Sequence, residues 1–132
     1  LFAGSGAYGL EAISRGAQLC YAVDIYKDAI STIHKNLSMM ALNHQFIVTQ
    51  STHLDFINSL DKKVMFDYIF LDPPYAINLY EETIEKLYQH THENTIIICE
   101  SKKDIILRDE ILGFKKTKDK AYGIKRVTIY ER

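Results

Sequence analysis

The residues best suited to chemistry form one tetrapeptide, Asp72-Pro73-Pro74-Tyr75, directly after the apolar run 68–71. A proline cannot donate to a sheet ladder, so the two prolines make the chain leave the strand end in a rigid, extended form. The Asp72 carboxylate and the Pro73 carbonyl are hydrogen-bond acceptors, and Tyr75 offers a ring face for stacking. This set suits an exocyclic amino group of guanine, adenine or cytosine. The alternative is an ordinary turn, which Asp-Pro commonly opens.

A glycine-rich segment near the start predicts a second site, for a cofactor that contains adenosine. Gly4, Gly6 and Gly9 have the G-x-G-x-x-G spacing, and Asp24 ends the next apolar run, 19–23. Glycines let a nucleotide approach the backbone, and the following helix start presents free N–H groups. An acid at the tip of the second strand can hold ribose hydroxyls. The spacing fits NAD as well as S-adenosylmethionine, and the structural alternative is a helix-capping turn followed by a surface aspartate.

The two segments together favour S-adenosylmethionine. In open α/β sheets, ligands bind outside the carboxyl ends of the strands. Asp24 and Asp72 both follow apolar strand-like runs, so we expect them at the same sheet edge. A nicotinamide oxidoreductase, by contrast, has no evident use for the tetrapeptide there.

The chain resembles the RsmD-type methyltransferases, bacterial enzymes that methylate the N2 amino group of a guanine in 16S ribosomal RNA. The resemblance covers residues 1–132 and is carried by three segments: the run Leu-Phe-Ala-Gly-Ser-Gly-Ala-x-Gly-Leu-Glu-Ala at 1–12, Asp-Pro-Pro-Tyr at 72–75 and Cys-Glu-Ser at 99–101. It implies a class I S-adenosylmethionine fold in a cytoplasmic enzyme. It also implies that 16S ribosomal RNA, or an assembling small ribosomal subunit, is the partner.

We predict the following roles at the reaction centre. Asp72 and Pro73 accept hydrogen bonds from the guanine amine and restore its lone pair, and Asp72 or water takes the proton. Tyr75 stacks on the guanine, which leaves its loop as single-stranded bases commonly do. Glu100 accepts from the guanine ring N–H, unless it is only a surface acid. The predicted catalytic set is Asp72, Pro73, Pro74 and Tyr75, with Tyr75 and Glu100 as substrate contacts.

For the cofactor, Asp24 is predicted to bind the ribose and Ile25 to pack on the adenine. The Gly4 and Gly6 backbone lies against the cofactor, and Ser5 bonds the methionyl carboxylate. The full predicted set is Phe2, Ala3, Gly4, Ser5, Gly6, Asp24, Ile25, Ser51 and Thr52. No metal and no nucleophilic side chain is required.

The chain departs from the family pattern in two places. In the family, a strand ending in Val-Leu-Asp and an amino-terminal extension precede Leu1, so this chain is expected to be an amino-terminally truncated fragment. Many methyltransferases also have an acid after the third strand that holds the adenine amino group. Here that segment reads Gln-Ser-Thr-His at 50–53, so adenine contacts are expected from neutral side chains or backbone.

Length and composition indicate one globular domain, and a monomer is expected because no feature of the sequence argues for a partner subunit. The chain has 132 residues, of which 47% are hydrophobic, and no apolar run approaches the roughly 20 residues that span a bilayer. Cys20 and Cys99 lie in apolar runs without metal-ligand spacing, which indicates buried, reduced thiols. The net charge is −1, but residues 101–132 hold ten Lys or Arg against five acids. This end could attract phosphates, or could be a solvated lysine-rich loop.

The pattern of elements predicts a Rossmann-like α/β fold, with a mostly parallel sheet covered by helices on both faces. Expected strands are 19–24, 46–49, 67–71 and 95–99. Expected helices are 27–42, with a buried stripe that includes Met40, 52–60, with Leu54 inward, and 78–90, with Tyr88 inward. Strands 114–118 and 126–130 are expected to close the sheet as an antiparallel hairpin around Gly123.

Three other functions stay open on the sequence alone. An amino-methyltransferase that acts on adenine N6 or cytosine N4 would also use Asp-Pro-Pro-Tyr. A more distant alternative is an NAD-dependent oxidoreductase, which the glycine spacing permits. The third is a module that takes up the cofactor but modifies no substrate.

Overall fold

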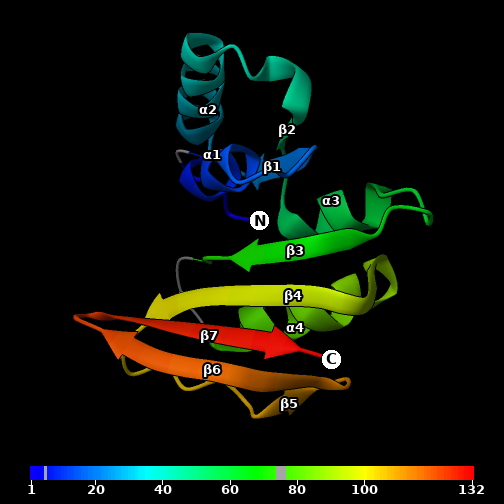
Figure 1. Cartoon of the computed structure of the whole chain (residues 1–132), viewed down its shortest axis with the longest axis vertical. Helices are drawn as coiled ribbons and strands as arrows, with labels where there is room; N and C mark the ends of the chain where they lie inside the picture. Colours follow the sequence, from blue (N-terminus) through cyan, green and yellow to red (C-terminus); the bar gives the residue numbers. More distant parts are fainter. Residues whose placement is uncertain (5, 74–76) are drawn as a thin grey trace. The chain divides into compact units, whose positions relative to one another are not determined.

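Two compact units, residues 1–58 and 59–132, make up the chain. The computed structural model describes residues 1–4, 6–73 and 77–132 (Figure 1). Each unit has its own sheet and is described here by itself. That the chain works as one domain stays a prediction.

The first unit pairs two parallel strands with three α-helices. Strands β1 (Cys20–Asp24) and β2 (Phe46–Gln50) align so that Cys20 lies opposite Phe46 and Asp24 opposite Gln50. The connection between them, about two dozen residues, is helical, as parallel strands require. The helices are α1 (Ala7–Ser14), α2 (Lys27–Met40), the short 3₁₀ helix η1 (Asn43–Gln45) and α3 (His53–Ser59).

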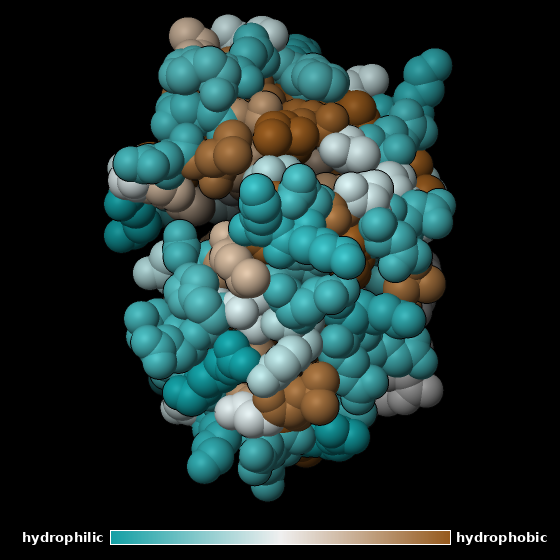
Figure 2. All heavy atoms as spheres, turned by 90° about the vertical axis from the view of Figure 1, so that its right-hand side faces the viewer, coloured by the Kyte–Doolittle hydropathy of each residue, from teal (hydrophilic) through white to brown (hydrophobic). Residues whose placement is uncertain are grey.

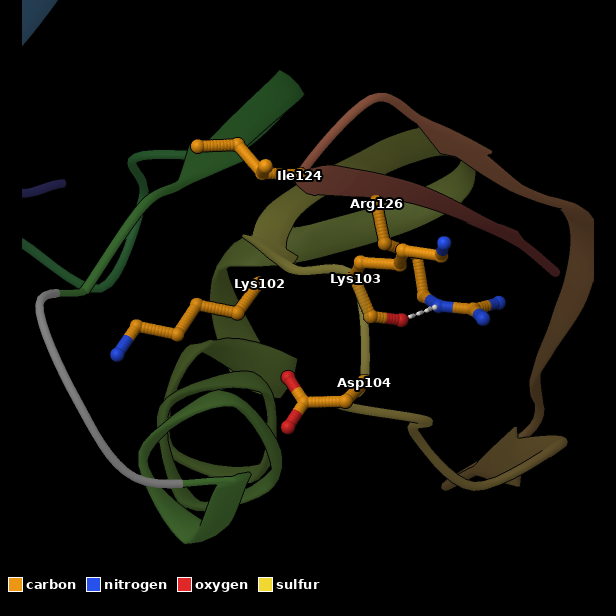
Figure 3. Close-up of a pocket in the computed structure, with 5 residues that line it drawn as sticks. All are labelled: Lys102, Lys103, Asp104, Ile124 and Arg126. Atoms are coloured by element: carbon orange, nitrogen blue, oxygen red, sulfur yellow. Dashed lines mark hydrogen bonds between the residues drawn. The ribbon is translucent and has the colours of Figure 1, made fainter.

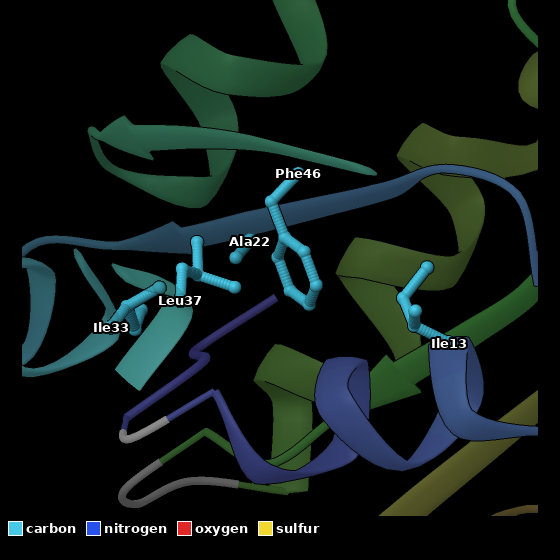
Figure 4. Packing of buried hydrophobic residues seen from close by; sticks show 5 residues of the cluster. All are labelled: Ile13, Ala22, Ile33, Leu37 and Phe46. Atoms are coloured by element: carbon cyan, nitrogen blue, oxygen red, sulfur yellow. The ribbon is translucent and has the colours of Figure 1, made fainter. Parts of the chain in front are cut away.

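Both faces of this small sheet are covered. Ala22 and Phe46 pack with Ile13 of α1 and with Ile33 and Leu37 of α2 in one buried cluster (Figure 4).

The next residue toward the start of β1, Tyr21, points to the opposite face, because side chains alternate along a strand. There its ring lies edge-on to Phe56 of α3, with 6.0 Å between ring centroids. The expectation of helices on both faces is therefore met in this unit.

The second unit is a five-stranded mixed sheet with the order β3-β4-β7-β6-β5. Strands β3 and β4 pair in parallel, and the other three ladders are antiparallel. Figure 1 shows α4 along one side of this sheet. The elements are β3 (Phe66–Leu71), α4 (Ile77–Leu87), η2 (Tyr88–His90), β4 (Thr91–Lys102), β5 (Glu110–Ile111), β6 (Phe114–Tyr122) and β7 (Lys125–Glu131).

Strand β4 shows which face of this sheet is the core. Ile97 and Cys99 are fully buried, whereas their neighbours Ile96 and Ile98 are half-buried. The buried face continues on β7, where Tyr130 lies opposite Ile97 and is also fully buried. Side chains alternate along a strand, so the half-buried apolar residues of β4 lie on the other face of the sheet. Glu100 and Lys125 lie on that face too, near the carboxyl end of β4.

The elements agree with most of the sequence expectations, but the strand expected at 95–99 is longer, since β4 runs from Thr91 to Lys102, and three details of the helices are wrong. Helix α2 ends at Met40 because Ala41 takes a left-handed conformation, with φ of 55°, and Met40 is 59% exposed. Leu54 faces solvent at 40% exposure, and Phe56 takes the inward position on α3. Tyr88 lies in the 3₁₀ turn after α4 and is 38% exposed, with its ring packed against the Arg132 guanidinium and edge-on to the ring of the buried Phe114.

The surface carries scattered hydrophobic side chains. Figure 2 shows hydrophobic residues in separate patches among hydrophilic ones. Among the side chains that the structure describes, the most exposed large apolar one is that of Ile124, at 83%, in the turn between β6 and β7. Neither cysteine forms a disulfide; Cys20 is half-buried and Cys99 fully buried. Within the described residues, every helix is too short or too polar to cross a membrane.

Candidate functional site

Asp24, the last residue of β1, ties the glycine segment to the strand end. One carboxylate oxygen, Oδ2, accepts the backbone N–H of Gly4 at 2.9 Å, and the other, Oδ1, accepts that of Tyr26 at 2.9 Å. The Ala3 N–H also donates to the Val23 carbonyl at 2.9 Å, which continues the strand contact into the glycine turn. The predicted partners Ala3, Gly4 and Asp24 therefore form one connected group.

Two different structural constraints explain the three glycines of this segment. Gly4 and Gly6 have φ of 57° and 82°, in the left-handed region that favours glycine. Gly9 lies where α1 crosses the sheet: a Cβ there would lie 2.7 Å from the Cys20 sulfur and 2.8 Å from the Phe46 ring. Gly9 is thus a packing residue, and the first two glycines shape the turn.

The remaining predicted cofactor residues surround the same strand ends. Ile25 is 54% exposed directly after Asp24. The Phe2 ring lies 5.2 Å from the ring of His53, centroid to centroid. Thr52 has a structural task, because its hydroxyl accepts the Asp55 N–H at 3.1 Å in the first turn of α3. The Ser51 hydroxyl donates to the Thr52 carbonyl.

These residues fit an adenosine group. A carboxylate offers about four lone-pair positions, and the backbone uses one on each oxygen of Asp24. Two positions therefore remain for the hydroxyls of a ribose. Ile25 is apolar and 54% exposed, so its side chain offers a surface on which a flat ring can pack.

In the second unit, Asp72 follows the last residue of β3, and Pro73 behind it is buried. The Asp72 side chain reaches solvent, yet partial desolvation by the protein around it raises the pKa of the carboxyl above its ordinary value. The Lys125 ammonium opposes this rise in the pKa. Asp72 is therefore an acid whose charge depends on a neighbouring cation.

Lys125 and Glu100 form an ion pair at the same sheet edge. Lys125 begins β7, Glu100 lies near the end of β4, and the ammonium donates to the Glu100 carboxylate. The Glu100 side chain is 14% exposed and that of Lys125 is 58% exposed. The hydrogen bond and the charge of Glu100, with a smaller contribution from Asp72, raise the pKa of Lys125. One cation thus serves two carboxylates.

Tyr80 of α4 supports this edge from the buried side. Its hydroxyl donates to the backbone carbonyl of Glu100, and the whole residue is buried. Burial, with the nearby charge of Asp72 as the second cause, raises the pKa of Tyr80, so the phenol keeps its proton. Tyr80 fixes the backbone from which the Glu100 side chain extends.

Lys125 and Tyr80 were not predicted as site residues. The hairpin register brings Lys125 to Glu100, with Glu100 opposite Val127 and Lys102 opposite Lys125. The sequence signal was the glycine at position 123, which marks the turn and therefore the residue that restarts the ladder. For Tyr80, the signal was an aromatic residue five positions after Tyr75 on the expected helix.

Three predicted residues, Ser5, Pro74 and Tyr75, lie outside the residues that the structure describes. Asp24 and Asp72 belong to different units, so their meeting at one site stays a prediction. Within each unit, the structure brings the predicted residues together: Ala3, Gly4 and Asp24 in the first, and Asp72 and Glu100, through Lys125, in the second.

Comparison with known proteins gives one family. The model of the family described as "Conserved hypothetical protein 95" matches residues 1–131. Ribosomal RNA small subunit methyltransferase D of Haemophilus influenzae is 32% identical, over 98% of this chain and 68% of its own length.

Solved structures agree. A conserved protein of unassigned function from Streptococcus pyogenes is 35% identical, with a TM-score of 0.91 over 98% of this chain and 81% of that one. A structure from Haemophilus influenzae, provisionally assigned as a methylase, is 32% identical, with a TM-score of 0.84 over 98% and 81%. The fold is therefore the Rossmann-like α/β fold of class I methyltransferases. The chain belongs to the RsmD-type methyltransferase family.

Proposed function

We propose that this protein transfers a methyl group from S-adenosylmethionine to the exocyclic N2 amine of a guanine in the RNA of the small ribosomal subunit. The family membership supports ribosomal RNA methylation, since the Haemophilus influenzae relative is named for it. We further propose that the two units work as one methyltransferase domain, with Asp24 and Asp72 at one site. A ribosomal substrate implies a cytoplasmic enzyme, and we propose a monomer.

The observation that carries the choice of guanine is the ion pair of Glu100 with Lys125. A carboxylate that accepts a hydrogen bond from an ammonium presents its remaining lone pairs as further hydrogen-bond acceptors. Of the two ring nitrogens beside the exocyclic amine of guanine, one (N1) carries a proton, whereas the single ring nitrogen beside the amine of adenine or cytosine is an acceptor. Glu100 therefore suits guanine, and would meet an acceptor with an acceptor in the other two bases.

The chain's own residues have the following roles in the reaction. S-adenosylmethionine, when bound by the Asp24 group, supplies an electrophilic methyl group on a positively charged sulfur. Asp72 and Pro73 accept hydrogen bonds from the two N–H groups of the amine, which draws its lone pair out of the aromatic ring. The nitrogen would then form its new bond to the methyl carbon as the carbon–sulfur bond breaks and the sulfur leaves as a neutral thioether, and the Asp72 carboxylate would receive the proton that the nitrogen loses.

Tyr80 and Lys125 position these groups without touching the substrate. Tyr80 holds the Glu100 backbone through a hydrogen bond. The Lys125 ammonium opposes the rise in the pKa of Asp72 that desolvation causes. We propose that Tyr75 stacks on the guanine ring. Of the cofactor set, Phe2, Ile25, Ser51 and Thr52 are proposed to surround the adenosine, Gly4 and Gly6 to admit it, and Ser5 to bind the methionyl carboxylate.

The test uses small-subunit particles from a strain that lacks the family's enzyme, incubated with the protein and radiolabelled S-adenosylmethionine. We expect label in one base of the 16S RNA, recovered as N2-methylguanine. Label in duplex DNA or in adenine or cytosine would favour the amino-methyltransferase alternative. Calorimetry separates the cofactors, because S-adenosylmethionine should bind and NADH should not.

A further inference from the structure

A basic surface lies beside the proposed reaction centre, at the same end of the second unit's sheet. It consists of Lys102 and Lys103 at the end of β4, Lys118, Lys120 and Tyr122 on β6, and Ile124 in the hairpin turn. We call it the hairpin-end surface. All six residues are exposed.

The four lysines differ from the other cations nearby. Lys116, Lys125 and Arg126 each pair with an acid within 3.4 Å. Over the described part of the chain, Lys102, Lys103, Lys118 and Lys120 have no acid partner. Their charge is therefore available to a ligand.

The ladder register makes this surface continuous with the proposed site. Lys125 lies opposite Lys102 on one side and opposite Tyr122 on the other. Neighbouring strands are about 4.8 Å apart, so these three residues span roughly 10 Å. Because Lys125 also pairs with Glu100, the hairpin-end surface adjoins the residues of the proposed reaction centre.

The shape suits a strand with phosphates. An open hollow of about 570 Å³ is lined by Lys102, Lys103, Asp104, Ile124 and Arg126 (Figure 3). In Figure 3 the Lys102 ammonium lies apart from the other residues drawn. Arg126 is held in place, since it donates to the Lys103 carbonyl at 2.8 Å and to Asp119 at 2.8 Å. Hydrogen bonds therefore tie Arg126 to the protein, whereas neither lysine of the hollow has an acid partner among the described residues.

Tyr122 adds a ring to the cations. The ammoniums of Lys118 and Lys120 lie 6.0 Å and 5.1 Å from its ring centroid, and 46% of Tyr122 is exposed. Proteins that bind single-stranded nucleic acids combine cations with accessible aromatic rings. The cations contact the phosphates, and the bases stack on the rings.

We propose that the hairpin-end surface binds the phosphate backbone of the single-stranded RNA that flanks the target guanine. This inference rests on the proposed function, which supplies the RNA. It explains how a protein with a net charge of −1 can hold a polyanion. The cations gather at one place next to the reaction centre, instead of covering the molecule.

The test measures the salt dependence of RNA affinity. Fluorescence anisotropy follows the binding of a fluorescein-labelled, unstructured RNA of twelve nucleotides, between 0.05 and 1 M KCl. The variant is Lys102→Ala with Lys103→Ala. Its matched control is Lys62→Ala with Lys63→Ala, because these two neighbouring exposed lysines precede the opposite end of β3.

The logarithm of the binding constant falls linearly with the logarithm of the salt concentration. Each lost phosphate contact makes this fall less steep by about 0.7 for single strands. We therefore expect this fall to be less steep by about 1.4 in the Lys102/Lys103 variant, so that, referenced to equal affinity at 1 M, the variant binds about 25-fold more weakly than the wild type at 0.1 M. The control should keep the wild-type slope. Lys118→Ala with Lys120→Ala should make it less steep by a similar amount, and thermal unfolding checks that all variants fold.

Three results would overturn the inference. The first is a wild-type slope in both hairpin-end variants. The second is an equal loss in the Lys62/Lys63 control. The third is equally tight, lysine-dependent binding of a polyglutamate peptide, which would indicate an acidic protein as the partner.

The same variants separate this inference from the proposed function. In the methylation assay, the Lys102/Lys103 variant should raise KM for RNA and leave kcat and cofactor affinity unchanged. Unchanged KM and RNA affinity, with normal methylation, would remove the hairpin-end surface and leave the function standing. Lysine-dependent RNA binding without any methylation of ribosomal RNA would instead remove the function.

Discussion

Lys125 donates from the start of β7 to the carboxylate of Glu100 near the end of β4. The same ammonium lowers the pKa of Asp72, although Asp72 follows a different strand, β3. Both acids at this edge therefore depend on one residue of the carboxyl-terminal hairpin, Glu100 for its ion pair and Asp72 for the ammonium that opposes the rise in its pKa. This dependence connects the hairpin, which contains none of the predicted catalytic residues, to the proposed chemistry.

Asp72→Ala should lower kcat for RNA methylation about 10²–10⁴-fold, the range of general acid–base contributions. The acceptor for the amine N–H is lost, while the residues that hold the cofactor are untouched. The measurement is initial-rate methylation of small-subunit particles, with calorimetry for the cofactor. Asp67→Ala is the matched control, because Asp67 lies on the same strand and its side chain is 80% exposed. Turnover near the wild-type rate would exclude Asp72 from the reaction.

The acid limb of the pH profile should follow Asp72. Its pKa is raised above the ordinary aspartate value, about 3.9, by desolvation, and only the ionised form accepts from the amine. The rate should therefore rise with pH through this raised pKa. The stability that the protonated acid gives should be lost over the same window, because the folded state binds the proton more tightly.

Lys125→Met should move the midpoint of that acid limb to higher pH. The ammonium lowers the pKa of Asp72, so its removal lets desolvation act unopposed. Lys125→Arg keeps the charge and should keep the wild-type midpoint. The check is kcat/KM against pH for the three proteins. A midpoint that stays in place or falls in Lys125→Met would contradict the role given to this residue.

Asp24→Ala should weaken cofactor binding by about 1.5–3 kcal/mol, the value of hydrogen bonds to a charged group. Part of the loss comes from the glycine turn, since Asp24 also accepts from the Gly4 N–H. Calorimetry with S-adenosylmethionine measures the affinity. Asp28→Ala, an exposed acid in the first turn of α2, is the control and should bind normally. Equal affinity in wild type and Asp24→Ala would remove the ribose assignment.

Gly9→Ala should destabilise the fold by about 1–3 kcal/mol, the usual cost of overpacking. The new methyl group would lie within 3 Å of the Cys20 sulfur and the Phe46 ring, and the gain in helix propensity is smaller, about 0.5–1 kcal/mol. Denaturant unfolding gives the free energy. In a Cys20→Ala background the cost should fall, because one of the two contacts is removed. An unchanged or higher free energy of unfolding would show that the helix can shift.

The sequence predicted the elements better than the contacts between side chains. Strands β1, β2 and β3 lie within one residue of expectation, because apolar residues dominate each of them. The bond between Asp24 and the Gly4 turn follows from a known spacing. The pairing of Lys125 with Glu100 could not be predicted, since it depends on hairpin register, and a slip of one residue would turn every side chain to the other face.

Helix faces were harder to predict for a related reason. Met40 fits the buried stripe by spacing, but the helix ends there and the side chain turns outward. Leu54 and Phe56 both fit one turn of α3, and the edge contact of Phe56 with Tyr21 decided which one is buried. A bulge between Lys116 and Lys118 shifts the register of β6, and nothing in the local composition marks it.

The packing shields the sulfur atoms of the two cysteines. Burial raises the pKa of the Cys99 thiol to about 12, and burial also raises that of Cys20. Maleimides react with thiolates, of which these positions offer few at neutral pH. A cysteine placed at Ile124 should therefore be labelled first, so a single dye can report on the hairpin turn without removal of the native cysteines.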